Sequence, residues 1–128
     1  MGKTKVLLID DEYDFQELMS IRMSGWGYDV IKASDGKEAI DLLLKENPDI
    51  IILDYIMPDM DGLEVLKKIR ELNKNIPVIM FTAHPDTKSF EGSDTLGIAA
   101  FIPKLSAYED AQSSLKTALN LALKKPAC

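Results

Sequence analysis

Short apolar runs rich in β-branched residues alternate along the chain with longer amphipathic stretches, and this alternation constrains the fold more than any other feature. The runs that we interpret as strands are Lys5–Asp10, Tyr28–Ala33, Ile50–Asp54, Val78–Thr82 and Ala99–Pro103. The stretches that we interpret as helices cover residues 13–25, 36–46, 62–73, 87–96 and 107–124. Strand–helix pairs without long linkers or repeats indicate one parallel sheet with helices on both faces. We therefore expect an α/β fold in a single domain over residues 1–128.

Two of the strand runs, Val6–Ile9 and Ile50–Leu53, are apolar throughout. A strand that is buried on both faces has no polar side, so these runs are predicted to be the central strands of the sheet. Before the second helix, Asp35 and Glu38 have the spacing of a capping box, in which two side chains satisfy the free amides of a helix start.

The composition excludes several classes of protein. The chain has 128 residues, and its hydrophobic share of 46% is too high for a disordered chain. No apolar run approaches the roughly 20 residues of a membrane span, and we expect no signal peptide before the first predicted strand. Fifteen basic and 21 acidic residues give a net charge of −6, which disfavours direct binding to nucleic acid or to an anionic membrane. The one cysteine, Cys128, cannot form an internal disulfide, and we expect a cytoplasmic protein.

Polar residues follow four of the five predicted strands. The first strand ends in the acidic run Asp10–Glu12, the third at Asp54, the fourth at Thr82 and the fifth near Lys104. In an open parallel sheet the functional site lies beyond the carboxyl ends of the strands. We therefore expect these residues to converge on one pocket.

Carboxylates of Asp10, Asp11 and Asp54 at this edge would repel one another. Two carboxylates about 4 Å apart interact by roughly 4 kcal/mol at an effective dielectric constant near 20. Such a cluster either binds protons or gathers cations, and oxygen ligands with access to water suit Mg²⁺. Lys104 would add a positive charge, and the Thr82 hydroxyl would donate a hydrogen bond to an incoming oxyanion. Together these groups predict phosphoryl transfer with a carboxylate as the nucleophile.

Each of these residues also has a simpler interpretation. The acidic run Asp10–Glu12 would favour a helix N-terminus through the helix dipole. Thr82-Ala83 alone would be an ordinary strand end, and a lone lysine such as Lys104 is usually solvated. Their joint occurrence at successive strand ends favours a site. The single histidine, His84, precedes a proline, and we interpret it as a surface residue rather than a metal ligand.

These motifs resemble those of the receiver domain of two-component response regulators, across essentially the whole chain. The residues that carry the resemblance are Asp10-Asp11-Glu12, the run Asp54-Tyr-Ile-Met-Pro-Asp-Met-Asp-Gly62, Thr82-Ala83, and Phe101 with Lys104. The resemblance implies a doubly wound (βα)5 flavodoxin-like sandwich, with a five-stranded parallel sheet of order 2-1-3-4-5.

The resemblance also implies the role of each site residue. Asp54 would accept a phosphoryl group, and Mg²⁺ or Mn²⁺ would be held by Asp11, Asp54 and the backbone carbonyl of Ile56, with Asp10 assisting through water. Lys104, Thr82 and Ala83 would contact the phosphoryl group, and Thr82 with Phe101 would form the switch pair. Ile56 and His84 would tune the lifetime of the phosphoryl group.

The implied partners are a sensor histidine kinase or a histidine phosphotransfer protein, which would phosphorylate the domain. A downstream protein would bind the surface formed by the fourth helix, fifth strand and fifth helix, and phosphorylation would promote a homodimer. The fourth helix contains Ser89, Gly92 and Ser93, which are poor helix-interior residues, so we expect it to be short or mobile. Such a protein is a regulatory phosphoacceptor rather than an enzyme. We expect no output domain within this chain after the fifth helix, which leaves open either a stand-alone receiver or a fragment of a larger regulator.

One residue departs from the family pattern. The family usually has a proline after the lysine, joined by a cis peptide, whereas Leu105 follows Lys104 here. We predict a trans Lys104–Leu105 bond, because a cis bond before a residue other than proline costs about 2.5–4 kcal/mol. Leu105 also leaves open a receiver-like domain that binds proteins constitutively, without phosphorylation.

Two enzymatic or ligand-binding alternatives fit the sequence less well. A flavodoxin-like flavin protein needs a loop of backbone amides after the first strand, where this chain has acidic residues that repel phosphate. A phosphohydrolase with an aspartyl nucleophile typically needs a second Asp two residues after Asp54, and Ile56 occupies that position.

Overall fold

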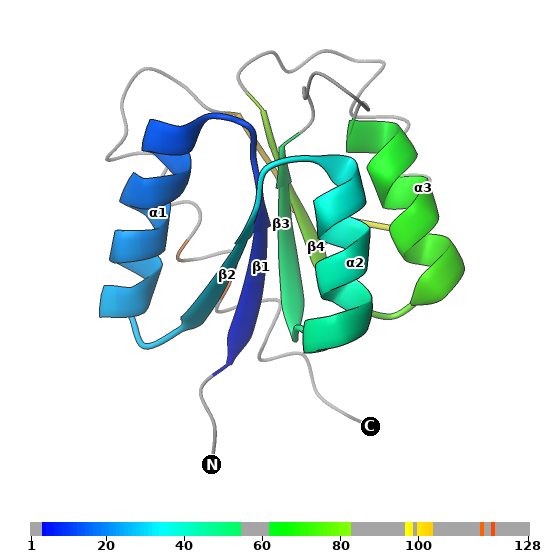
Figure 1. Cartoon of the computed structure of the whole chain (residues 1–128), viewed down its shortest axis with the longest axis horizontal. Helices are drawn as coiled ribbons and strands as arrows, with labels where there is room; N and C mark the ends of the chain where they lie inside the picture. The colour runs from blue at the N-terminus through cyan, green and yellow to red at the C-terminus, as the bar shows by residue number, and fades with distance from the viewer. Residues whose placement is uncertain are drawn as a thin grey trace.

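The computed structural model describes residues 4–54, 62–82, 97, 98, 100–103, 116 and 119. Within these residues the helices and strands follow the predicted order (Figure 1). They are β1 (Lys5–Ile9), α1 (Tyr13–Gly25), β2 (Asp29–Ala33), α2 (Gly36–Glu46), β3 (Ile50–Asp54), α3 (Gly62–Leu72), β4 (Val78–Thr82) and β5 (Ala100–Pro103). Each boundary lies within one residue of its predicted position.

The strands form one five-stranded sheet of order β2-β1-β3-β4-β5, and every neighbouring pair is parallel. The order implied by the family resemblance is therefore confirmed. In the register of the sheet, Ile9 of β1 pairs with Ala33 of β2 and with Leu53 of β3. Asp54 pairs with Phe81 of β4. The carboxyl ends of these strands therefore lie at one edge, which is the upper edge in Figure 1.

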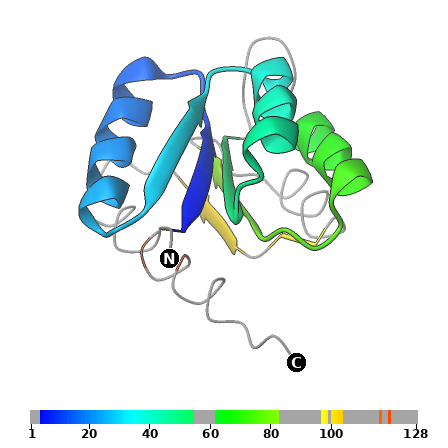
Figure 2. The same cartoon turned by 60° about the horizontal axis from the view of Figure 1, so that its bottom comes forward.

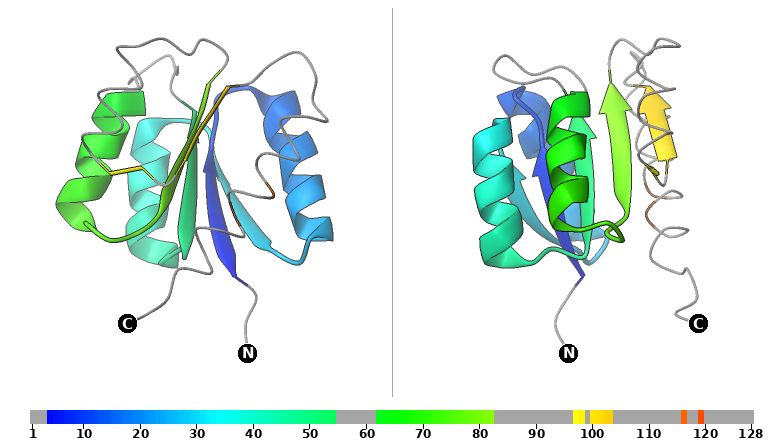
Figure 3. Two further views of the ribbon diagram at one scale, coloured as in Figure 1. Left: turned by 180° about the vertical axis from the view of Figure 1, so that it is seen from behind. Right: turned by 90° about the vertical axis from the view of Figure 1, so that its right-hand side faces the viewer.

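Helices cover both faces of the sheet. Helix α1 lies on one face, and α2 and α3 lie side by side on the other (Figures 2 and 3). This arrangement follows from the parallel pairing, since each crossover helix must pack on the sheet as the chain returns to start the next strand.

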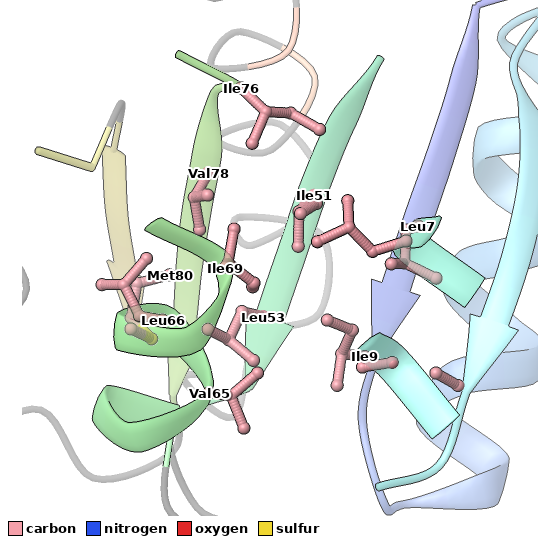
Figure 4. Close-up of a cluster of buried hydrophobic side chains, with 13 residues drawn as sticks. Leu7, Ile9, Ile51, Leu53, Val65, Leu66, Ile69, Ile76, Val78 and Met80 are labelled. Atoms are coloured by element: carbon pink, nitrogen blue, oxygen red, sulfur yellow. The ribbon is translucent and has the colours of Figure 1, made fainter. Parts of the chain in front are cut away.

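The hydrophobic core is divided by the sheet into two clusters. Alternate residues of β1 face opposite sides. Leu7 and Ile9 pack beneath α2 and α3 (Figure 4), whereas Val6 and Leu8 belong to the cluster beneath α1. The residues Val6–Ile9 and Ile50–Leu53 are each at most 1% exposed. The prediction that these two apolar runs are central strands is therefore confirmed.

The predicted capping box forms with one difference. The Asp35 carboxylate accepts a hydrogen bond from the Glu38 amide at 2.8 Å, as an N-cap residue does. The Glu38 carboxylate reaches one residue further back than in a capping box, where it accepts a hydrogen bond from the Ser34 amide at 2.7 Å. These bonds fix the turn from the end of β2 into α2.

Two residues of the fifth predicted helix are described, and both are helical. Leu119 is buried in the cluster beneath α1, and Lys116 Nζ lies 5.6 Å from the centre of the Trp26 ring, a cation–π contact. The fourth predicted helix, 87–96, and the rest of 107–124 lie outside the described residues. No helix within the described ranges is long and apolar enough to cross a bilayer.

Candidate metal and phosphoacceptor site

Two acidic side chains are buried at the carboxyl edge of the sheet. Asp10 directly follows β1 and is 2% exposed, while Asp54 ends β3 and is 4% exposed. Because Ile9 pairs with Leu53, Asp10 and Asp54 are each the next residue after a paired position, at the carboxyl ends of neighbouring strands. A carboxylate is rarely buried unless it is paired, hydrogen-bonded or bound to a metal, so this placement marks a site.

A third carboxylate joins these two. One oxygen from each of Asp10, Glu12 and Asp54 lies within 4.8 Å of the others. Two charged carboxylates at this separation repel each other by about 3–4 kcal/mol at an effective dielectric constant of 20. Oxygen-only donors, two of them buried and Glu12 exposed, have the chemistry of a site for a hard divalent cation such as Mg²⁺. The residues present therefore fit the predicted metal.

Glu12 was not among the predicted ligands. It is the N-cap residue of α1, yet its side chain makes no capping hydrogen bond to the helix. Its carboxylate oxygen belongs instead to the acidic group with Asp10 and Asp54. Asp11 is exposed at the same edge and is not part of that group. The feature of the sequence that could have indicated Glu12 as a ligand is the unbroken run of three acidic residues, Asp10–Glu12, after the first strand.

Hydrogen bonds hold the backbone of this acidic turn. The Asp10 amide donates to the Ala33 carbonyl at 3.0 Å, and the Asp10 carboxylate accepts from the Glu12 amide at 2.9 Å. Gln16 of α1 is 3% exposed, and its Nε2 donates to the carbonyl oxygens of Asp10 at 3.1 Å and Ala33 at 2.9 Å. No motif in the sequence pointed to Gln16.

The structure places the backbone of two other predicted residues. Thr82 is the last residue of β4, one position beyond the partner of Asp54, and pairs with Pro103. Phe101 lies on β5 and pairs with Met80. Both members of the predicted switch pair therefore lie on neighbouring strands. The predictions for Ile56, Ala83, His84, Lys104 and the Lys104–Leu105 bond fall outside the described residues.

Away from this edge, Arg70 joins α3 to the segments that enter β4 and β5. Its guanidinium donates to the carbonyl oxygens of Ile76 at 2.7 Å, Gly97 at 2.9 Å and Asn73 at 3.3 Å. Burial lowers the pKa of Arg70 below its usual value. The contacts lie toward the amino ends of the strands, so Arg70 supports the scaffold rather than the acidic site.

A family model described as "Response regulator receiver domain" matches residues 6–120. The chain belongs to the response regulator receiver family. Receiver domains are signalling modules of two-component systems rather than classical enzymes, and their signalling depends on phosphorylation.

Individual relatives agree with this assignment. Sporulation initiation phosphotransferase F of Bacillus subtilis is 32% identical over 121 residues, which cover 94% of this chain and 98% of that protein. A probable transcriptional regulator of Guillardia theta, ycf27, is 41% identical over 107 residues, but these cover 80% of this chain and 42% of the regulator. The receiver chain therefore spans nearly all of one relative and less than half of the other.

Solved structures of receivers share the fold. The chemotaxis protein CheY4 of Vibrio cholerae superimposes with a TM-score of 0.82 at 28% identity, over 91% of this chain and 99% of that one. The response regulator TrrA of Thermotoga maritima, solved in complex with Mg²⁺ and BeF, gives a TM-score of 0.77 at 29% identity over 92% and 99%. These likenesses confirm the doubly wound receiver fold.

Proposed function

We propose that Asp54 is the phosphoacceptor of this receiver, and that its phosphorylation requires a divalent cation. The observation that supports this most strongly is the buried Asp54 carboxylate, with carboxylate oxygens of Asp10 and Glu12 within 4.8 Å. Mg²⁺ or Mn²⁺ would be held by Asp11, Asp54 and the Ile56 carbonyl, with Asp10 assisting through water, and Glu12 is a further candidate ligand.

The proposed chemistry is nucleophilic attack by a carboxylate on phosphorus. The deprotonated Asp54 oxygen forms a bond to phosphorus while the bond from phosphorus to the donor's histidine nitrogen breaks, and that nitrogen leaves with the electron pair. The bound cation would neutralise the negative charge on the phosphoryl oxygens. Lys104 would pair with that charge, Thr82 and the Ala83 backbone would donate hydrogen bonds to it, and Ile56 and His84 would govern the approach of hydrolytic water.

The proposed donor is a sensor histidine kinase or a histidine phosphotransfer protein, and we expect the exchange to take place in the cytoplasm. Phosphorylation would draw the Thr82 hydroxyl inward and let Phe101 follow, because the new group adds about −1.5 to −2 charges and three oxygens that need donors. The changed surface around β5 and its flanking helices would then bind a downstream protein or a second copy of the chain.

Intact-mass spectrometry tests the proposal. The native protein, the variant Asp54→Asn and a control, Asp29→Asn, are each incubated with Mg²⁺ and a small phosphodonor such as acetyl phosphate. The Asp29 carboxylate is exposed and lies at the amino end of β2, away from the acidic site. The native chain and the control are expected to gain one phosphoryl group that Asp54→Asn does not gain. Equal labelling of Asp54→Asn would contradict the assignment of Asp54. A native chain that gains no mass would favour the constitutive protein-binding module instead.

A further inference from the structure

A buried glutamine lies directly behind the acidic turn. Gln16 is 3% exposed, and its Nε2 lies within hydrogen-bond distance of two carbonyl oxygens, those of Asp10 and Ala33. Because both partners are acceptors, only the NH₂ end of the amide can face them, and each of its two hydrogens has a partner.

The two hydrogen bonds of Gln16 lie just beyond the last paired residues of the sheet. The pairing of β1 with β2 stops at Ile9 and Ala33, and the pairing of β1 with β3 stops at Ile9 and Leu53. The Asp10 carbonyl lies beyond both ladders, at the point where the chain turns toward α1. Gln16 supplies the donor that a further strand residue would otherwise provide.

The amide therefore restrains the backbone on both sides of Asp10. The Asp10 amide is held by Ala33, and the Asp10 carbonyl is held by Gln16, which also bonds to Ala33. That carbonyl belongs to the planar peptide linking Asp10 to Asp11, so fixing it also limits the backbone of Asp11.

Gln16 is a polar residue on the buried side of α1, where its neighbours are apolar. Phe15, Met19 and Met23 on the same helix are buried in the core cluster beneath α1. An amide among apolar side chains is unfavourable unless it is hydrogen-bonded, and residues that break a local pattern in this way concentrate at functional sites.

We propose that Gln16 is a positioning residue of the acidic site, which orients Asp10 and the residues that follow it for binding of a divalent cation. This inference rests on the proposed metal site. Partners in the shell outside a metal's ligands typically change its affinity by about 10- to 100-fold when they are removed. Removal of the Gln16 amide is expected to weaken Mg²⁺ binding at the lower end of that range, about tenfold.

Calorimetric titration with MgCl₂ alone tests this inference without phosphorylation. The variant is Gln16→Met, which is similar in size to glutamine but cannot donate. The control is Met19→Ala, which loosens the packing of the same helix one turn away and removes no hydrogen bond to Asp10. Circular dichroism establishes that each protein is folded at the titration temperature. The expected result is a dissociation constant raised about tenfold in Gln16→Met and unchanged in Met19→Ala.

The outcomes separate the inference from the proposed function. A Mg²⁺ dissociation constant in Gln16→Met equal to that of the native chain would overturn the role of Gln16 while leaving the metal site in place. An increase in Met19→Ala as large as that in Gln16→Met would do the same. A native chain that does not bind Mg²⁺ would overturn the proposed metal site and the inference with it. If Gln16→Met does not fold, Gln16→Ser provides the same comparison, since it leaves room for a water to satisfy the two carbonyls without holding them rigidly.

Discussion

Asp10 and Asp54 lie at the carboxyl ends of neighbouring strands, both buried, with carboxylate oxygens within 4.8 Å of each other. The relationship follows from the parallel register, because Ile9 pairs with Leu53 and the next residue of each strand therefore lies at the carboxyl edge of the sheet. It places two negative charges where a single cation can neutralise both, and it predicts opposite effects on stability and on metal binding.

Replacement of Asp10 by Asn is expected to stabilise the metal-free protein. Asp10→Asn keeps an acceptor for the Glu12 amide but removes one of two close buried charges, so the free energy of unfolding should rise by about 1–2 kcal/mol in EDTA. At a Mg²⁺ concentration 100 times the dissociation constant, the native chain should gain about 2.7 kcal/mol, and the variant less. Urea denaturation with and without Mg²⁺ measures both quantities. Lower stability of Asp10→Asn in EDTA would contradict this prediction.

The Arg70 contacts predict a purely structural effect. Arg70→Met leaves the carbonyls of Ile76 and Gly97 without the donors that they have now, and loss of such a donor costs about 1–3 kcal/mol. Urea denaturation should show this loss, whereas Lys68→Met, at an exposed position of the same helix, should change stability little. Because Arg70 lies away from the acidic group, Mg²⁺ affinity should be unchanged, and a weakened affinity would contradict its separation from the site.

Tyr28 predicts part of the alkaline pH dependence of stability. Burial raises the pKa of Tyr28 above its ordinary value of 10.0. A group whose folded-state pKa is raised contributes stability that is complete below its unfolded pKa, and that stability is lost as the pH rises through the folded pKa. Tyr28→Phe should therefore lose less stability than the native chain above pH 10, while their difference below that pH stays constant. Parallel pH profiles of the two proteins would contradict this.

Leu105 predicts a kinetic difference. A cis bond costs about 2.5–4 kcal/mol before leucine but roughly 0.5–1 kcal/mol before proline, so we predict a trans bond and a slower approach of Lys104 to the phosphoryl group. Leu105→Pro should be phosphorylated faster by acetyl phosphate in a time course of intact mass. A variant that is phosphorylated no faster than the native chain would remove this explanation.

The sequence predicted the elements closely because burial on both faces leaves a direct pattern in strands such as Val6–Ile9 and Ile50–Leu53. It also predicted Asp10 and Asp54 at one edge, since parallel strands end together. The order of the strands came from the family resemblance, because periodicity alone does not say which strands are neighbours.

The residues that the sequence analysis missed are those whose partners come from the tertiary fold. Gln16 bonds to backbone carbonyls of Asp10 and Ala33, and a carbonyl carries no residue-specific signal. The only indication was a polar residue beside Phe15 on the buried side of α1. Glu12 was not predicted as a ligand for another reason. An acidic residue at the start of a helix is usually explained by its favourable interaction with the helix dipole.

The most direct test of the central claim is to locate the phosphoryl group on the chain. After incubation with Mg²⁺ and acetyl phosphate, borohydride reduction converts an aspartyl phosphate to homoserine, which tandem mass spectrometry of the digested protein can assign to one residue. We predict conversion at Asp54 alone, and no conversion when EDTA replaces Mg²⁺. Conversion at Asp10 or Asp11, or undiminished conversion at Asp54 in EDTA, would contradict the account.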